Sequence, residues 1–161
     1  MKLRDELKKN NCIRIKIIII IFRIGFVSKY ESNNLILKNI FKFLYYILKS
    51  MSFVCQAGVL PSIRTYIDWG LCIPHGFKGI EINPYVKIGK NCTLYHNTTI
   101  GKIDFVDGIA EIGDNVYIGA HTLILGGTTI GDNCKIGAGS KIISKNIPSN
   151  STVVTKYRVF S

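Results

Sequence analysis

The chain contains three histidines, His75, His96 and His121, and histidine is the side chain best suited to exchange a proton near neutral pH. A positioned imidazole that takes the proton of an attacking hydroxyl typically accelerates a reaction by about 10² to 10⁴-fold. A carboxylate bonded to the second ring nitrogen would fix the tautomer of such a base. The three histidines are therefore candidates for a general base.

A metal centre is not expected from the sequence. The three histidines are 21 and 25 residues apart and form no close pair. The five cysteines show no Cys-x-x-Cys and no other metal-ligand spacing, and they stand at Cys12, Cys55, Cys72, Cys92 and Cys134. An odd number of cysteines in this arrangement predicts reduced thiols in a cytoplasmic protein.

A six-residue repeat indicates the elements that must position these side chains. Every sixth residue is aliphatic, through Ile82, Ile88, Leu94, Ile100, Val106, Ile112, Ile118, Ile124, Ile130, Ile136 and Ile142. Six is a multiple of the strand period of two but not of the helical 3.6, so each hexad is expected to be a short strand followed by a turn. Three hexads would form one triangular coil, and coils would stack about 4.8 Å apart around an aliphatic core.

Small residues and glycines accompany the repeat. The position two residues before most of the aliphatics is small or slim, as at Cys92, Thr98, Ala110, Val116, Thr122, Thr128, Cys134 and Ser140. Glycine often follows the aliphatic, at Gly89, Gly101, Gly113, Gly119, Gly131 and Gly137. We expect these glycines to adopt unusual dihedrals at the corners, which Asn and Asp also tolerate. Two aspartates flank Val106, so the segment 102–108 is expected to loop out.

Length and charge limit the functional classes. A chain of 161 residues corresponds to one domain, and 47% hydrophobic residues exclude wholesale disorder. The formal net charge of +11 is uneven, since residues 1–50 carry eleven basic and three acidic residues and residues 51–161 carry ten and seven. Such a basic patch suits nucleic acid, anionic lipid or a phosphorylated substrate. No nucleic-acid motif supports the first of these, so nucleic acid is not an expected partner.

The N-terminal third is expected to be helical. Residues 35–54 predict a helix with Lys38, Lys42 and Lys49 on a polar side, residues 14–27 predict a second helix, and Asn33-Asn34 marks the break. These helices either lie in a membrane interface or cap the first coil. No apolar run approaches the length of a membrane span. The expected organisation is basic helices with a connecting loop at 1–78, a β-helix at 79–147 and a C-terminal tail at 148–161.

Several phrases of the repeat resemble the hexapeptide-repeat acyltransferases. They include Ile-Gly-Asp-Asn-Val-Tyr-Ile-Gly-Ala from Ile112 and Thr-Ile-Gly-Asp-Asn-Cys-Lys-Ile-Gly-Ala from Thr129. Gly-Ile-Glu-Ile-Asn-Pro from Gly79, followed by Lys-Ile-Gly-Lys from Lys87 and by His96, is similar to the serine acetyltransferase-like branch. The resemblance covers residues 75–154. It implies a left-handed parallel β-helix, a homotrimer and acetyl-CoA in a groove between adjacent prisms.

The resemblance also implies roles for particular residues. In that branch a histidine base is oriented by an acidic residue fifteen positions earlier, which assigns His96 as the base and Glu81 as its orienting residue. His75 and Tyr95 are expected to contact the acceptor, and His75 and His121 remain alternative bases. Serine acetyltransferases carry Asp immediately before the base and a second His in a later loop, where this chain has Tyr95 and Ile109. Both departures argue against serine as the acceptor.

The resemblance and the small residues suggest where acetyl-CoA would bind. Small side chains let backbone N–H groups approach the pantetheine arm, which favours Gly119, Ala120, Gly126, Gly127, Gly137 and Ala138. Lys141 and Lys145 are expected to meet the phosphates. The family's terminal Gly-x-Pro-Ala is replaced by Thr-Lys-Tyr-Arg from Thr155, so the adenine end of the site departs from the family pattern.

The expected function is an acetyl-CoA-dependent O-acetyltransferase that acts on a hydroxyl of a surface-polysaccharide sugar, as in a capsule or O-antigen. Its expected location is the cytoplasm, with contact to the inner face of the membrane as an option. The alternative within enzymes is serine O-acetylation in cysteine biosynthesis. An inactive β-helix scaffold is an alternative of another class, and a zinc hydratase on the same helix is disfavoured because it needs three converging histidines.

Overall fold

The computed structural model of the chain describes residues 2–54, 61–104 and 107–155. The helical elements come first: α1 (Lys2–Lys9), α2 (Ile13–Phe26), a π-helical turn η1 (Val27–Glu31) and α3 (Leu35–Val54). Short strands follow: β1 (Tyr66–Ile67), β2 (Glu81–Ile82), β3 (Lys87–Ile88), β4 (Thr93–Leu94), β5 (Thr99–Gly101), β6 (Glu111–Ile112), β7 (Tyr117–Ile118), β8 (Leu123–Leu125), β9 (Thr129–Ile130), β10 (Lys135–Ile136), β11 (Lys141–Ile143), β12 (Asn146–Ile147) and β13 (Thr152–Val153).

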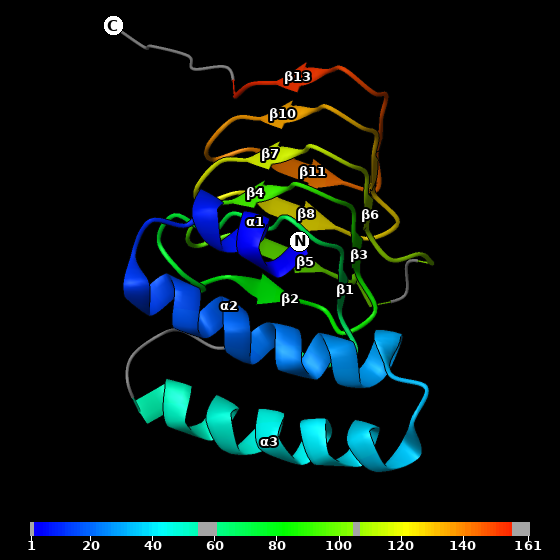
Figure 1. Ribbon diagram of the computed structural model, residues 1–161. Coiled ribbons are helices and arrows are strands. Elements are labelled where there is room, and N and C mark those ends of the chain that lie inside the picture. Colours follow the sequence, from blue (N-terminus) through cyan, green and yellow to red (C-terminus); the bar gives the residue numbers. More distant parts are fainter. Residues whose placement is uncertain (1, 55–60, 105–106, 156–161) are drawn as a thin grey trace, which may run out of the picture.

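The strands form three parallel sheets that are the faces of a triangular prism (Figure 1). Their orders are β1-β3-β6-β9-β12, β13-β10-β7-β4 and β11-β8-β5-β2, so each strand pairs with the strand one coil away. In the third sheet, for example, Ile82 pairs with Ile100 and Ile100 with Ile124. The predicted left-handed parallel β-helix with an N-terminal helical segment is confirmed.

The aliphatic repeat forms the core, since nine of its eleven members belong to one buried apolar cluster, the partly buried Ile82 packs against that cluster, and Val106 lies outside the described residues. The small residues two positions earlier close the corners. The hydroxyls of Thr98, Thr122 and Ser140 each donate to the carbonyl three residues before, at 2.8, 2.7 and 2.6 Å. Buried corner hydroxyls thereby satisfy backbone carbonyls that the strand ladders leave unpaired.

The expected dihedrals of the repeat glycines are wrong. Positive φ falls instead mostly on asparagines, such as Asn91, Asn115 and Asn133, and also on His121 and Ser144, while none of the six repeat glycines has it. The glycines are needed because adjacent coils approach closely: a Cβ at Gly119 would lie 2.6 Å from the backbone nitrogen of Ala138. Asparagine tolerates the left-handed conformation, so it takes the turn while glycine permits the stacking.

The repeat is interrupted twice. Twelve residues separate Ile100 from Ile112, and no strand is described between β5 and β6, in agreement with the expected loop. Upstream, Ile67 and Ile73 are six residues apart but Ile82 follows nine later, so a three-residue insertion hides an earlier coil. Paired strands accordingly extend from β1 to β13, beyond the predicted limits 79 and 147 on both sides. Residues 156–161 of the predicted tail lie outside the described part.

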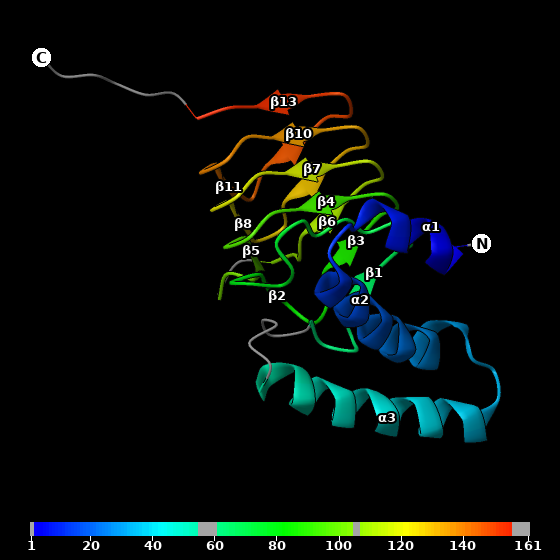
Figure 2. The ribbon, with the colours of Figure 1, turned by 60° about the vertical axis from the view of Figure 1, so that its left-hand side comes forward.

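The predicted helices at 14–27 and 35–54 correspond to α2 and α3, with the break at residues 32–34. Both views show α2 lying across the first coil and α3 beneath it, at the end of the prism opposite β13 (Figures 1 and 2). Ile18, Ile19 and Phe22 of α2 join the same apolar cluster as Ile67 and Leu71 of the first coil. One of the two expected roles, capping of the first coil, is therefore observed for α2.

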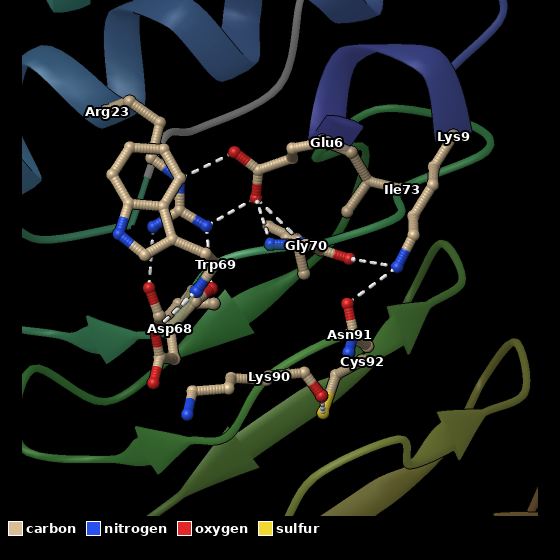
Figure 3. A network of polar contacts seen from close by, with 12 residues as sticks. Glu6, Lys9, Arg23, Asp68, Trp69, Gly70, Ile73, Lys90, Asn91 and Cys92 are labelled. Atoms are coloured by element: carbon tan, nitrogen blue, oxygen red, sulfur yellow. Dashed lines mark hydrogen bonds and ion pairs between the residues drawn. The ribbon is translucent and has the colours of Figure 1, made fainter. Parts of the chain in front are cut away.

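A buried ion pair fastens this cap to the chain that follows β1 (Figure 3). The Arg23 guanidinium donates to both carboxylate oxygens of Glu6. It also donates to the carbonyls of Ile67 and Asp68, each at 2.6 Å. The same carboxylate accepts from the backbone N–H groups of Gly70 and Leu71. These bonds satisfy an edge that would otherwise present unpaired backbone groups.

Candidate functional site

At one corner of the prism, residues from three successive coils lie above one another. Because Leu94 pairs with Ile118 and Ile118 with Ile136, the tripeptides that follow lie above one another. These tripeptides are Tyr95-His96-Asn97, Gly119-Ala120-His121 and Gly137-Ala138-Gly139. The hydrogen bonds from the N–H of His121 to the carbonyl of His96, and from Gly139 to Ala120, confirm this register.

The first coil adds His75 to this corner. Cys72 forms an isolated parallel bridge with Thr93, which sets His75 beside His96 at the same offset of 21 residues. The Nδ1 atoms of His75 and His96 are 2.7 Å apart, and the ring centroids 4.7 Å. One Nδ1 must carry the hydrogen and the other accept it. The spacing of 21 residues shows no close pair in the sequence, but it equals one eighteen-residue coil plus the three-residue insertion, so the fold brings these two rings together.

The corner is aromatic and partly open to solvent. His121 packs edge-on against His96 with centroids 5.4 Å apart, and Tyr95 packs edge-on against His75 at 5.6 Å. Tyr117 lies 5.3 Å from Tyr95 one coil further. His75 and His121 are exposed, whereas His96, between them, is half-buried.

The pKa of His96 lies below its ordinary value. Partial desolvation is the largest cause, followed by the positive charge that His75 and His121 would carry. Both causes disfavour the imidazolium form of His96. At neutral pH His96 is therefore held neutral, with one ring nitrogen available to accept a hydrogen bond.

Glu81 lies apart from this arrangement. It is exposed on β2, where its backbone N–H bonds to the carbonyl of Thr98. Among the described residues its carboxylate makes no hydrogen bond or ion pair with His96, whose polar partner is His75. The predicted spacing of fifteen residues is present, but the contact that it was expected to produce is not.

The residues predicted to bind acetyl-CoA divide between two corners. Gly119, Ala120, Gly137 and Ala138 continue the histidine corner through the next two coils. Gly126 and Gly127 follow β8 at the next corner, where Gly126 has a positive φ of 66° and approaches Ser144, the neighbour of Lys145. Lys141 lies exposed on β11, on the face between the two corners.

Alternative sites would be a metal centre or a hollow away from the histidine corner. No group of three potential ligands within 2–54, 61–104 and 107–155 is arranged to hold a metal ion, the three histidines included. A shallow hollow of about 400 Å³ lies on the sheet β1-β3-β6-β9-β12, the prism face opposite the histidine corner. Lys87 and Glu111 form an exposed ion pair there, so this hollow offers no proton acceptor comparable to the histidines.

Sequence reasoning missed the residues that hold His75 in place. Besides the Glu6–Arg23 pair, Asn10 accepts a hydrogen bond from the N–H of Ile73 and donates to the carbonyl of Leu71, both at 2.9 Å. The N-terminal helices therefore fix the segment that leads into His75. A signal was present in the hexad spacing of Ile67 and Ile73, which places a coil before the first recognised repeat.

Comparisons with known proteins agree with this fold. The family model described as "Bacterial transferase hexapeptide (six repeats)" matches residues 109–144. The serine acetyltransferase of Neisseria gonorrhoeae, solved in complex with serine, is 30% identical over 96% of this chain and 66% of its own, with a TM-score of 0.73. Isoform 3 from Entamoeba histolytica, in complex with cysteine, is 26% identical over 94% of this chain and 51% of its own, with a TM-score of 0.68.

The soybean serine acetyltransferase complexed with serine is 27% identical over 85% of this chain and 54% of its own, with a TM-score of 0.64. This chain thus spans between half and two thirds of these solved proteins. No curated protein sequence matches it significantly. Within the described residues, no helix is long and apolar enough to cross a membrane.

Proposed function

The chain belongs to the hexapeptide-repeat acyltransferases, in their serine acetyltransferase-like branch, and from that premise we propose that it transfers the acetyl group of acetyl-CoA to a hydroxyl. The observation that carries the proposal is the 2.7 Å contact between Nδ1 of His75 and Nδ1 of His96. It supplies an oriented base at the corner that continues into the glycines and alanines proposed to line the acyl donor site.

His75 is the proposed catalytic base, and His96 is its positioning residue. If Nδ1–H of His75 donates to Nδ1 of His96, then Nε2 of His75 is unprotonated and free to accept a proton. This direction is favoured because His75 is the exposed member of the pair, so that its Nε2 can meet an acceptor, whereas His96 is half-buried. The His96 imidazole would thus orient His75 as the carboxylate orients the histidine in a Ser-His-Asp arrangement, without supplying a negative charge.

The reaction follows from this arrangement. Nε2 of His75 takes the hydroxyl proton as the acceptor oxygen attacks the carbonyl carbon of the thioester. The carbon–sulfur bond then breaks, and the departing CoA sulfur takes the proton back from Nε2. The ester and free CoA are the products, and His75 returns to its starting protonation state.

The donor site is proposed to be completed by a second copy of the chain in a homotrimer. The outward side chains of the sheet β11-β8-β5-β2 include Leu123, Leu125 and Ile143, of which Ile143 is 46% exposed. An apolar strip on a prism face favours burial against a neighbouring prism. Pantetheine would then lie near Ala120 and Ala138, with Lys141 and Lys145 available to the phosphates.

L-serine is the acceptor that the comparisons favour, since solved relatives are serine acetyltransferases in complex with serine. A sugar hydroxyl of a surface polysaccharide is the second candidate. Pro74 and Tyr95, which precede the two histidines, offer no carboxylate to the ammonium group of serine. The half-buried Tyr95 and the exposed Tyr117 beside it suit the apolar face of a pyranose instead.

The test is release of CoA thiol by the purified chain with acetyl-CoA, supplied with L-serine or with nucleotide-linked and oligomeric sugars. Turnover with either acceptor is expected, together with thermal stabilisation by CoA. His96→Gln should retain more activity than His75→Gln, and the matched control His121→Asn should retain nearly all of it. The reverse order of the first two variants would exchange their roles. If the chain shows no turnover and is not stabilised by CoA, the scaffold alternative remains.

A further inference from the structure

Asn10, between α1 and α2, bonds to backbone groups through both ends of its carboxamide. Its Oδ1 accepts from the N–H of Ile73, and its Nδ2 donates to the carbonyls of Leu71 and Glu6, at 2.9, 2.9 and 3.0 Å. The residue is only 1% exposed. Because the acceptor and the donor of this buried amide are both used, its orientation is fixed.

These bonds lie where a preceding coil would pair with the first coil. Cys72 faces the following coil, where its N–H donates to the carbonyl of Cys92. The carbonyl of Leu71 and the N–H of Ile73 point the other way, since successive residues of an extended chain bond to opposite sides. The side-chain amide of Asn10 therefore takes the place of a peptide group from an absent strand.

His75 lies in a tight turn that begins at Ile73. The carbonyl of Ile73 accepts from the N–H of Gly76 at 2.9 Å, and Gly76 has a positive φ of 69°. Pro74 restricts the backbone between them. Ile73 is thus bonded through its N–H to Asn10 and through its carbonyl to the turn, so a shift of Ile73 would move His75.

The contact between the two histidines is sensitive to such a shift. Nδ1 of His75 and Nδ1 of His96 are 2.7 Å apart. A displacement of about 1 Å would lengthen this contact beyond the range of a hydrogen bond. His96 follows the regular strand β4, which pairs with β7, so the N-terminal segment acts on the His75 side of the contact.

We propose that Asn10 is a positioning residue for His75: it fixes the turn relative to the following coil and thereby keeps Nδ1 of His75 within hydrogen-bond distance of Nδ1 of His96. The inference rests on the proposed function, in which His75 is the base. It gives the N-terminal helical segment a part in acetyl transfer, in addition to its part in covering the first coil.

The test is Asn10→Ala in the full chain. It should lower kcat by about 10 to 10²-fold, the loss expected when a reacting group is slightly misplaced. KM for acetyl-CoA should change by less than about twofold, because the proposed donor site lies on other coils. The NMR titration midpoint of His96 should rise toward about 6.5, since the partial burial and the His75 charge that lower its pKa both decrease.

Asn10→Ser keeps a hydroxyl in the gap and is used if Asn10→Ala does not fold. Both effects are then expected, to a smaller extent. Kinetics and titrations are compared at a temperature where circular dichroism shows every variant to be folded.

Tyr45→Phe is the matched control. The buried Tyr45 hydroxyl donates to the carbonyl of Pro61 at 2.6 Å, so this variant also removes a buried bond between the N-terminal segment and the backbone. That bond lies outside the segment that leads into His75. Even if Tyr45→Phe melts at a lower temperature, its kcat and its His96 midpoint should remain those of wild type.

The proposal is overturned if Asn10→Ala keeps the wild-type midpoint of His96, or if Asn10→Ala and Tyr45→Phe lower kcat equally. Absence of turnover in the wild-type protein would refute the proposed reaction instead. The His96 midpoint would then decide alone whether Asn10 positions the histidine pair, so the two failures are distinguishable.

Discussion

Two polar clusters lie along the short segment that joins Asp68 to His75, and they differ in how fully they are satisfied. At its start, the Glu6 carboxylate and the Arg23 guanidinium are buried and bonded to each other and to the backbone. At its end, the His75–His96 pair is partly open to solvent and shares one hydrogen bond between the Nδ1 atoms. The first cluster holds structure, and the second keeps ring nitrogens available for chemistry.

The largest expected effect comes from breaking the buried Glu6–Arg23 pair. Arg23→Met should lower the free energy of unfolding by about 3 to 5 kcal/mol, because it leaves the Glu6 carboxylate buried without its partner. Urea denaturation followed by circular dichroism measures this change. The double variant Glu6→Met/Arg23→Met should recover part of the loss, since no buried charge remains. A single variant as stable as wild type would mean that the pair is not buried in solution.

At the His75–His96 pair, a substitution should change activity strongly and stability little. His75→Gln should lower kcat by about 10² to 10⁴-fold, as expected for loss of a general base. The free energy of unfolding should change by no more than about 0.5 kcal/mol, because the side chain is exposed. Thiol-release kinetics and urea denaturation on the same preparation test both halves. A large loss of stability would place His75 with the structural cluster instead.

The pH dependence of His96 sharpens the comparison further. The pKa of His96 is lowered in the folded state, so the unfolded chain binds this proton more readily. The resulting contribution to stability is present above the ordinary pKa of about 6.5, and it is lost as pH falls from there through the folded-state pKa. The NMR titration midpoint of His96 should lie below 6.5 in wild type. It should rise in His75→Gln, because one of the positive charges that lower it is removed. An unchanged midpoint would contradict the coupling.

The smallest effect is expected at Glu81. Glu81→Gln should change kcat by less than about twofold and leave stability within about 0.5 kcal/mol, because the carboxylate is exposed and makes no described contact with His96. Thiol release under the conditions used for His75→Gln makes the comparison direct. A loss approaching that of His75→Gln would restore the role first expected from the fifteen-residue spacing.

The outcome at Glu81 and His75 shows which parts of the site were predictable. The resemblance pointed to His96, and the regular repeat predicted the corner that continues into Gly119, Ala120, Gly137 and Ala138, because these residues follow strands of that repeat. It did not identify the partner of His96. That partner comes from the coil whose period is broken by three residues, so counting in sixes did not reach it.

The sequence by itself determined the β-helix and the two longer helices, because a six-residue aliphatic period and an amphipathic helical stretch are local patterns that each allow one backbone geometry. Only the tertiary structure decided the pairing of His75 with His96, the use of asparagine for the left-handed turns, and the burial of Glu6 against Arg23. Each of these depends on which coils or helices lie side by side. Contacts between segments 17 and 21 residues apart are set by register and packing, which no local pattern encodes.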